Sequence, residues 1–450
     1  MKIEVSNRVT IRGLNPLDIE HVAIMDRLLG RFTFDNPLYW DARRNRRPCR
    51  NIPRKILLCS VESDGTTTCP RGASGEVNRL VGAQGGPVVD ATALPHREPL
   101  PFKGSLRDYQ ELAVEAALRE KQGVIQAPTG SGKTVIAMAL AARVETPVLM
   151  VVHTSVLFEQ TAQRIREFLG TEPGLVGGGH DEPGDVTVAM VQTLMRRDLA
   201  PWARRFGMVI LDEAHHCPAE TFKTVVQQFH GRYRFGLTAT PKRKDRLHPV
   251  LFDVVGPIVH EVKPGTLLAS GSIARAEVVE VETGYRGRYR RNDYQSLINR
   301  LVKNRDRNVL VLDSIGRYHR ERSLVLTERV QHGKMLAEEL RRRGMKAEAM
   351  TGDMAKDRRV DVLDRFRDGR VELLVSTVAL VGEGFDLPAI DAVFLTVPNG
   401  SPGKTTQALG RALRPHAGKK SGRIVDFVDV QVPLLRNQFK RRARVYRSFN

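Results

Sequence analysis

The sequence lacks the features that would assign it to several common classes of protein. Its four cysteines are Cys49, Cys59, Cys69 and Cys217, and no C-x-x-C pair occurs, so neither a zinc ribbon nor a disulfide scaffold is indicated. The first residues alternate like a β-strand and contain no apolar signal-peptide core. The apolar stretch at residues 135–144 is far too short to span a bilayer. We therefore expect a soluble, cytoplasmic protein with no membrane partner.

Acidic residues are scarce relative to basic ones. Lysine and arginine together number 71 against 51 aspartates and glutamates, which leaves a net charge of +20. Such an excess suits a polyanionic partner, most simply a nucleic acid, and a generally basic soluble protein is the alternative. No nuclease motif of the P-D…E-x-K type is present. The composition therefore favours binding of a nucleic acid without indicating its cleavage.

The composition changes along the 450 residues and predicts their organisation. Residues 84–105 are rich in glycine and proline and show no sustained period, which predicts a linker. Residues 1–83 before it are expected to form a small β-rich or α+β accessory module that binds DNA. In residues 106–268, and again in residues 269–450, short apolar runs alternate with helical patterns. This alternation predicts an α/β fold with two parallel sheets, each wrapped by helices.

A phosphate-binding loop is the clearest local signal. A predicted strand ends at Gln126, and the "APTGSGKT" that follows turns into a helix. Glycines at this point let main-chain N–H groups and the helix N-terminus surround phosphate oxygens. Lys133 is expected to reach the β- and γ-phosphates, and the hydroxyl of Thr134 to bind Mg²⁺. The expected nucleotide contacts of the loop are Thr129, Gly130, Ser131, Gly132, Lys133 and Thr134.

A second strand supplies the acidic residues that a phosphate site needs. In "MVILDEAHH" four apolar residues lead to Asp212 and Glu213 at the carboxyl end of the strand. Asp212 is expected to hold Mg²⁺ through water, and Glu213 to orient and deprotonate the attacking water. For an isolated D-E pair, a solvated helix start would be the alternative. The pair in this position favours hydrolysis of the nucleotide over transfer of a phosphoryl group to another substrate.

These motifs occur in an order and spacing that resemble a known family. "APTGSGKT", "DEAHH" and "LTATP" resemble motifs I, II and III of superfamily 2 helicases, while residues 376–388 and 407–415 are similar to motifs V and VI. The resemblance covers residues 106–450. It implies two tandem RecA-like domains, an ATP-binding one followed by a C-terminal helicase domain, with ATP and Mg²⁺ as cofactors. The blocks after motif III resemble the xeroderma pigmentosum B type, and small phage enzymes that remodel branched DNA, rather than DEAD-box RNA helicases.

Upstream of the P-loop, "LRDYQ" resembles the element that recognises adenine in this family. The resemblance implies that Gln110 bonds the adenine edge and that Arg107 stacks on its face. ATP would then be preferred over GTP. The start of a plain amphipathic helix is the alternative explanation for this stretch.

Motifs V and VI imply further residues at the nucleotide. Arg411 and Arg414 are three residues apart, so they share a face if the segment is helical. The resemblance implies that both reach the γ-phosphate as arginine fingers from the second domain, with Gln407 beside them. It also implies that Gly384 lies near the nucleotide and Asp386 near its ribose. Hydrolysis would then depend on closure of the two domains.

Nucleic acid is expected along the carboxyl ends of the strands, where α/β folds bind ligands. Each candidate position is also explained by a turn or a helix cap. Because phosphates carry little sequence information, binding is expected to be sensitive to salt and tolerant of sequence. The residues that match the family's nucleic-acid contacts are Thr154, Gly178, Gln192, Thr193, Thr327, Arg329, Thr351, Gly352, Ser376 and Thr377.

The N-terminal module contains a further candidate contact. Tyr39 and Trp40 precede a run of arginines that includes Arg43 and Arg44. Arginines bind phosphates and aromatic rings stack on exposed bases, so these four residues are expected to contact DNA. A solvated basic loop with its aromatics in the core is the alternative. The basic residues 436–450 are expected to form a helix that either follows DNA or only keeps the protein soluble.

Together these signals predict an ATP-dependent DNA helicase or translocase that acts as a monomer on single-stranded, forked or branched DNA. The resemblance implies movement from 3′ to 5′ and a role in replication, recombination or repair, in a bacterial or phage-infected cytoplasm. Three alternatives stay open. They are a duplex-DNA translocase that does not separate strands, an RNA helicase, and a catalytically silent nucleic-acid-binding scaffold.

Overall fold

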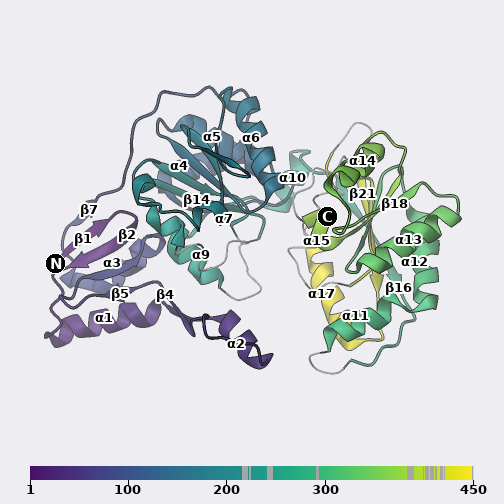
Figure 1. The fold of residues 1–450 in the computed structure, drawn as a ribbon, viewed down its shortest axis with the longest axis horizontal. Coiled ribbons are helices and arrows are strands. Elements are labelled where there is room, and N and C mark those ends of the chain that lie inside the picture. Colours follow the sequence, from purple (N-terminus) through teal and green to yellow (C-terminus); the bar gives the residue numbers. More distant parts are fainter. Residues whose placement is uncertain are drawn as a thin grey trace. The chain divides into compact units, whose positions relative to one another are not determined.

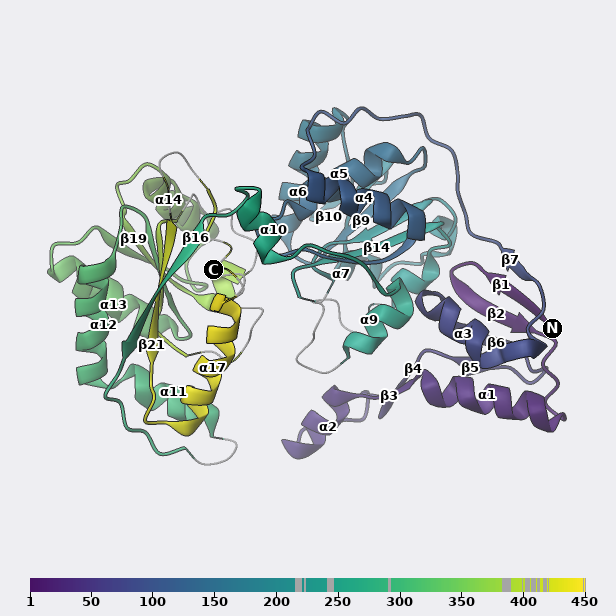
Figure 2. The same cartoon turned by 180° about the vertical axis from the view of Figure 1, so that it is seen from behind.

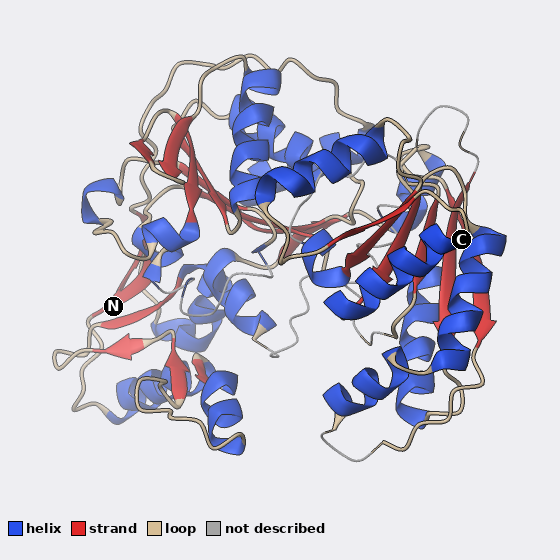
Figure 3. Ribbon diagram, turned by 45° about the vertical axis from the view of Figure 1, so that its right-hand side comes forward, coloured by secondary structure: helices blue, strands red, loops and turns tan. Residues whose placement is uncertain are grey.

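The computed structural model describes residues 1–214, 221, 224–240, 247–289, 293–382, 390–398, 400, 405, 410, 413–415, 419, 421–447 and 449. The chain forms two compact units. The first comprises Met1–Ala127 and Gly132–Glu261, and the second comprises Val262–Asn450 with the short segment Pro128–Ser131. Each unit contains a large sheet of mainly parallel strands with helices on its faces (Figures 1 and 3), which confirms the predicted α/β class.

The N-terminal residues form a five-stranded sheet in the order β5-β6-β2-β1-β7. β7 runs parallel to β1, and the other neighbours pair antiparallel. Helices α1 (Ile19–Arg31) and α3 (Ser74–Val81) pack apolar side chains against this sheet, so the predicted α+β module is present. The strands are β1 (Lys2–Val5), β2 (Arg8–Arg12), β5 (Ser60–Val61), β6 (Thr67–Pro70) and β7 (Val88–Asp90).

An excursion interrupts this sheet between β2 and β5. Strands β3 (Thr33–Asp35) and β4 (Lys55–Leu57) pair antiparallel as a separate two-stranded ribbon. The residues between them contain helix α2 (Pro37–Arg44), which Asn36 caps by accepting a hydrogen bond from Leu38 N. The arginine run that the sequence singles out therefore lies on a ribbon outside the five-stranded sheet (Figure 2).

An eight-stranded sheet follows in the order β11-β10-β12-β9-β13-β14-β8-β15. All its neighbours run parallel except the edge strand β11. The strands are β8 (Gln122–Gln126), β9 (Val148–Val152), β10 (Gly174–Gly177), β11 (His180–Glu182), β12 (Val186–Met190), β13 (Met208–Leu211), β14 (Tyr233–Thr238) and β15 (Ile258–Glu261). The apolar runs of residues 106–268 form strands β8, β9, β12, β13 and β14, as predicted. β10, β11 and β15 are additions to the prediction, because β10 is bounded by glycines and the edge strands β11 and β15 contain no buried residue.

Helices cover both faces of this sheet. α4 (Asp108–Glu120), α5 (Lys133–Arg143) and α6 (Ser155–Leu169) pack side by side along one face. Alternate strand residues, which point to the opposite face, share one hydrophobic core with α9 (His248–Val255) and with the N-terminal module. The first 83 residues are thus not a separately packed body, since their core continues into that of the first large sheet.

Polar contacts reinforce the same junction. Arg31, at the end of α1, donates to Glu76 on α3 at 2.8 Å and to Asp253 on α9 at 3.0 Å. The segment 84–105, predicted as a linker, also packs: it contains β7, and the buried Arg97 donates to the main-chain oxygen of Val144 at 2.6 Å. Glycine and proline interrupt the hydrophobic periodicity of this segment, but the segment still packs against the rest of the first unit.

Two buried arginines lie where the module meets the large sheet. Arg71 donates to the carbonyl oxygens of Ser6 at 3.2 Å and Gly231 at 2.6 Å. Arg234 donates to the carbonyl oxygen of Asn7 at 3.3 Å. Burial lowers the pKa of Arg71 to about 10, so its guanidinium stays charged at neutral pH and requires these acceptors.

The second unit holds a six-stranded parallel sheet in the order β16-β21-β20-β17-β19-β18. The apolar runs of residues 269–450 form strands β17, β18, β19, β20 and β21, as predicted, and β16 is an addition that pairs along its whole length with β21. The strands are β16 (Arg275–Glu282), β17 (Ser323–Thr327), β18 (Ala347–Met350), β19 (Leu373–Thr377), β20 (Ala392–Leu395) and β21 (Ser421–Val428). The main helices are α11 (Tyr294–Val302), α12 (Arg305–Tyr318), α13 (Val330–Arg342), α14 (Lys356–Arg367) and α17 (Pro433–Arg447).

The basic tail is helix α17, which docks on the second unit by buried charges. Arg442 Nε donates to Asp426 Oδ2 at 2.7 Å, and Tyr446 Oη donates to the same oxygen at 2.7 Å. Both members of the ion pair are almost fully buried. One face of the helix is therefore committed to packing, while Arg441 and Arg444 remain exposed. Among the helices that the structure describes, none has the length and apolar character needed to cross a bilayer.

We expect Arg71→Met to lower the stability of the first unit by ~3 kcal/mol, because buried carbonyl oxygens would lose charge-assisted donors. The measurement is the denaturant midpoint of the full-length protein. Arg79→Met, on an exposed position of the neighbouring helix, is the matched control and should leave the midpoint unchanged. Equal midpoints for both variants would show that Arg71 does not tie the module to the sheet.

Candidate active site and strand-end surfaces

The candidate nucleotide site lies where parallel strands end together. β8, β14 and β13 are neighbours in one sheet, so their carboxyl ends meet at the same edge. The P-loop follows β8, the Asp212–Glu213 pair follows β13, and Thr238 ends β14. Ala127 N donates to Thr238 O at 2.9 Å, which joins the start of the P-loop to the third motif through the main chain.

The P-loop lysine contacts the catalytic candidate directly. Lys133 Nζ lies 3.1 Å from Glu213 Oε1 and 3.5 Å from Ala127 O. The two side chains are only 12% and 20% exposed, so the ion pair is shielded from water. A triphosphate would compete with Glu213 for this lysine. The arrangement thus brings together the two residues that the sequence assigns to phosphate binding and to activation of water.

Backbone geometry of the P-loop depends on glycine. Gly132 has a φ of 77°, and a Cβ there would lie 2.4 Å from Gln110 Nε2. Gln110 is 5% exposed, and its Oε1 accepts from Arg107 N at 3.0 Å. Its amide therefore packs between the start of α4 and the P-loop, and Arg107 is exposed beside it. Contact of either residue with adenine stays a prediction.

Asp212 has the environment of a metal ligand. Burial of the carboxyl group is the main cause that raises the pKa of Asp212 to about 6, and the neighbouring Glu213 carboxylate raises it further. The positive charge of Lys133 lowers this pKa. Its Oδ1 accepts from Glu213 N at 2.9 Å. Asp212 and Thr134 line the same small cavity of about 10 Å³, together with apolar side chains, which is room for about one water. A half-buried carboxylate and a half-buried hydroxyl that line the same cavity fit the predicted Mg²⁺ ligands.

No group of three or more histidine, cysteine or acidic side chains that could hold a metal occurs in the described part of the chain. Mg²⁺ is usually held by one or two side chains together with waters and substrate phosphates, which is the kind of site that Asp212 and Thr134 would give. Glu213 also has a φ of 45°, a conformation that costs energy for a residue with a Cβ. In this conformation the Glu213 carboxylate lies beside Lys133.

Four candidates for nucleic-acid contact lie at the adjoining strand ends of the first unit. Thr154 follows β9 and caps α6 by accepting from Leu157 N at 3.2 Å. Gln192 follows β12, and its Nε2 donates to His153 O at 2.8 Å, which links the ends of β12 and β9. The exposed Gly178 follows β10, and Thr193 lies beside that strand's last residue. The structure therefore brings these four positions together, next to the nucleotide residues on the same edge.

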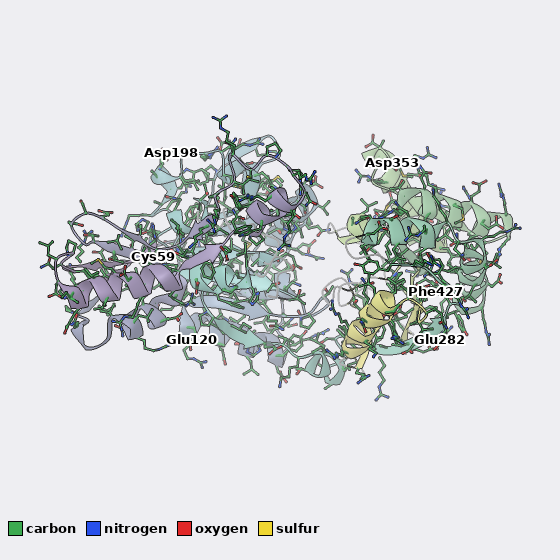
Figure 4. All side chains as sticks on the ribbon, turned by 90° about the horizontal axis from the view of Figure 1, so that it is seen from below. Cys59, Glu120, Asp198, Glu282, Asp353 and Phe427 are labelled. Carbon is green, nitrogen blue, oxygen red and sulfur yellow. The ribbon has the colours of Figure 1, made fainter. Side chains whose placement is uncertain are left out.

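In the second unit the candidate hydroxyls face inward. Thr327 and Ser376 are fully buried, and Thr351 is 1% exposed. Ser376 Oγ donates to Met350 O at 2.8 Å, and Thr351 Oγ1 donates to Asp353 Oδ1 at 2.5 Å. Asp353 is labelled on the second unit in Figure 4. These hydroxyls stabilise the strand ends and do not present themselves to solvent. Thr377 is likewise buried, and its Oγ1 accepts from Leu380 N at 3.4 Å.

The hydroxyl of Thr327 belongs to a buried network that the sequence did not indicate. It bonds His332 Nδ1 at 2.8 Å, and His332 Nε2 bonds Asn308 Oδ1 at 3.2 Å. Burial, followed by the nearby Arg307, lowers the pKa of His332 to about 3. The imidazole is therefore neutral at physiological pH and accepts from the Thr327 hydroxyl. A single histidine in a helical pattern carries no signal for such a network.

The remaining candidate residues of the second unit differ in their surroundings. Some are exposed, some form hydrogen bonds within the unit, and some lie outside the described residues. Gly352 is exposed at the end of β18. Arg329 is half-buried, and its guanidinium donates to Asn299 Oδ1 at 2.8 Å and Gln295 Oε1 at 2.5 Å. Arg414 is half-buried, and its carbonyl accepts from Lys419 Nζ. The predicted residues that lie outside the described residues are Gly384, Asp386, Gln407 and Arg411.

The candidates on the N-terminal ribbon differ in exposure. Arg43 and Arg44 are exposed, whereas Tyr39 and Trp40 are half-buried. The two rings pack edge to face with centroids 5.4 Å apart, and the Arg54 guanidinium lies 5.3 Å from the Trp40 ring centroid. The aromatic side chains are thus used within the ribbon, an arrangement that no sequence pattern signals.

Comparison with known proteins adds to this geometry. The family model of the type III restriction enzyme res subunit matches residues 103–243, and that of the helicase conserved C-terminal domain matches residues 306–416. The DNA 3′-5′ translocase XPB2 of Sulfurisphaera tokodaii is 31% identical over 364 residues, which are 70% of this chain and 81% of the relative. The DNA 3′-5′ helicase XPB of Mycobacterium tuberculosis is 29% identical over 395 residues, 82% of this chain and 69% of that protein.

Among solved structures, the ATP-dependent Type ISP restriction-modification enzyme LlaBIII bound to DNA has a similar fold. The TM-score is 0.57 at 18% identity, over 78% of this chain and 30% of that one. At this identity the likeness concerns the fold alone. It agrees with the tandem RecA-like domains that the motifs predict.

We expect Glu213→Gln to lower ATP turnover by about 100-fold or more, because the amide cannot accept the proton of the attacking water. Binding of ATP should persist, since Lys133 loses a competing carboxylate. The measurement is phosphate release beside equilibrium nucleotide binding. Glu261→Gln, at the exposed end of β15 in the same sheet, is the matched control and should retain full turnover. Normal turnover in the Glu213 variant would remove this residue from its predicted role.

Proposed function

The chain belongs to the XPB-like superfamily 2 helicases, and on that premise we propose that it hydrolyses ATP to move along DNA from 3′ to 5′. The observation that carries the proposal is the Lys133–Glu213–Asp212 constellation at neighbouring strand ends. It holds a phosphate-binding cation, a carboxylate for water activation and a carboxylate for a metal within one sheet edge.

The residues divide the chemistry among themselves. Lys133 binds the triphosphate, and main-chain N–H groups of the P-loop surround its oxygens. Mg²⁺, held by Thr134 and Asp212, would supply charge neutralisation for the phosphates. Glu213 orients the attacking water and takes its proton. Stabilisation of the γ-phosphate by Arg411 and Arg414 remains a prediction from the sequence, as does the binding of ribose and adenine.

DNA is proposed to follow the strand ends of the sheets. In the first unit Thr154, Gly178, Gln192 and Thr193 form a continuous edge of caps and turns beside the ATP residues. Because the hydroxyls at the strand ends of the second unit are buried, we assign phosphate binding there to main-chain N–H groups near Gly352. Contacts of this kind ignore base sequence, which suits a motor that must track any strand.

The substrate is proposed to be forked or branched DNA. The net charge of +20 supports a nucleic acid, and the printed names of the relatives specify 3′-5′ movement on DNA for those proteins. The complete set of catalytic side chains speaks against a catalytically silent scaffold. Tracking along duplex DNA without strand separation is the second candidate, since one of the relatives is named a translocase.

A panel of nucleic acids tests the proposal. We expect single-stranded and forked DNA to raise the ATPase rate several-fold over the rate without DNA, and matched RNA to raise it less. A fork with a 3′ tail should be unwound, and one with a 5′ tail should not. The measurements are phosphate release and strand displacement on the same substrates.

A triplex-displacement assay separates the two candidate activities. Release of a third strand without unwinding of any fork would identify a duplex translocase. Stronger stimulation of ATP hydrolysis by RNA than by DNA would identify the protein as an RNA helicase instead. An ATPase rate that no polynucleotide changes would contradict the motor altogether.

A further inference from the structure

The N-terminal module carries a basic projection that takes no part in the ATP site. We define the arginine tip as residues 36–54, which lie between β3 and β4. Figures 1 and 2 show α2, within the tip, at the far end of the ribbon and away from the five-stranded sheet. The two strands pair over three residues each, so the ribbon extends roughly 10 Å.

The tip has a defined backbone although it contributes little to the core. Asn36 N donates to Arg54 O at 3.0 Å, and Asn36 Nδ2 donates to Pro53 O at 2.9 Å, which closes the base. Within the tip, whose residues are all described, only Asn36 and Ala42 are buried. Side chains beyond the base can therefore be changed without loss of the packing that holds the module together.

The charge of the tip is not neutralised by the protein. Arg43, Arg44, Arg46 and Arg50 are all exposed, and within the described residues no hydrogen bond or ion pair engages their side chains. Arg47, by contrast, is paired with Asp41. Exposed arginines elsewhere on the chain commonly have acidic partners, such as those of the pairs Arg342–Glu338 and Arg367–Asp364. Four unpaired guanidiniums within eight residues form a concentrated site for anions.

The aromatic side chains of the tip decide what kind of nucleic acid it suits. Arg54 lies over the Trp40 ring and Tyr39 packs against that ring edge to face, so the half-buried indole already has two partners within the tip. The tip therefore offers guanidiniums for phosphates rather than rings for stacking. Phosphates lie most densely on a duplex, which carries one charge per ~1.7 Å of helix axis.

We propose that the arginine tip binds the phosphate backbone of the duplex arm of a forked or branched DNA. The inference rests on the proposed DNA motor and deepens it. In this arrangement the carboxyl ends of the β-strands in the two large sheets bind one DNA strand. The tip binds the duplex from which that DNA strand emerges. The tip would raise affinity for junctions over single strands without reading sequence, because it touches phosphates alone.

The test is the affinity of the full-length protein for DNA, measured without nucleotide at several salt concentrations. The variant changes Arg43, Arg44 and Arg50 together to glutamine. We expect binding of forked and duplex DNA to weaken about tenfold or more and the salt slope to fall by about 2 to 3, because three phosphate contacts are lost. Binding of single-stranded DNA, and the ATPase rate that it stimulates, should change less than twofold.

A matched variant on the same module controls for net charge. Arg12, Arg27 and Arg79 are exposed positions outside the tip, and their joint change to glutamine removes the same charge. This variant should bind forks as the unaltered protein does. Both variants should keep the unfolding midpoint, because all six side chains are exposed.

Several results would overturn the proposal. They are unchanged fork affinity in the tip variant, an equal loss in the control variant, or an equal loss for single-stranded DNA. Trp40→Leu provides an independent measurement, since a selective loss of single-strand binding would show that the ring stacks on bases after all. A larger loss for duplex RNA than for duplex DNA would assign the tip to RNA.

The affinity measurement also separates this inference from the proposed motor. If no polynucleotide stimulates ATP hydrolysis by the unaltered protein, the motor proposal fails, yet fork binding still shows whether the tip holds duplex DNA. If single-stranded DNA stimulates hydrolysis and the tip variant binds forks normally, the motor stands and the tip assignment is wrong.

Discussion

Parallel hydrogen bonding between neighbouring strands is the constraint on which both candidate sites depend. It aligns the carboxyl ends of β8, β14, β13, β9, β12 and β10 at one edge of one sheet. The P-loop and the acidic pair occupy one half of that edge, and the candidate DNA contacts occupy the other half. The candidate phosphate-binding residues and the candidate DNA contacts therefore lie on neighbouring strands, with β13 beside β9.

Arginine serves two opposite purposes in this basic protein. Arg71 and Arg234 are buried and donate hydrogen bonds to main-chain carbonyl oxygens. These bonds connect the N-terminal module to the sheet that carries the candidate ATP site. Arg43, Arg44, Arg46 and Arg50 of the tip are exposed, and no hydrogen bond or ion pair from the described residues engages their side chains. The net charge alone cannot distinguish these roles, because both count equally in it. Burial and the position of acceptors decide which arginines are available to DNA.

The N-terminal module consequently works as part of the first unit. Its core is continuous with that of the large sheet, and Arg31 adds a bridge from α1 to α9. The ribbon that carries the tip and the strand ends of the first large sheet therefore belong to one compact unit. Preorganisation of this kind lowers the entropy cost of binding, because no flexible domain has to be ordered when DNA arrives.

The sequence by itself determined the α/β class and most strands of both large sheets, and it supplied the candidate residues of the ATP site. These signals are local: apolar runs make buried strands, and the chemistry of phosphate demands glycine, lysine, hydroxyl and carboxylate at strand ends. Only the tertiary structure decided that Thr327, Thr351 and Ser376 turn inward, that Arg54 lies over the Trp40 ring, and that the module shares a core with its neighbour. Each of these depends on contacts between residues distant in sequence or on the direction of a side chain, which no local pattern records.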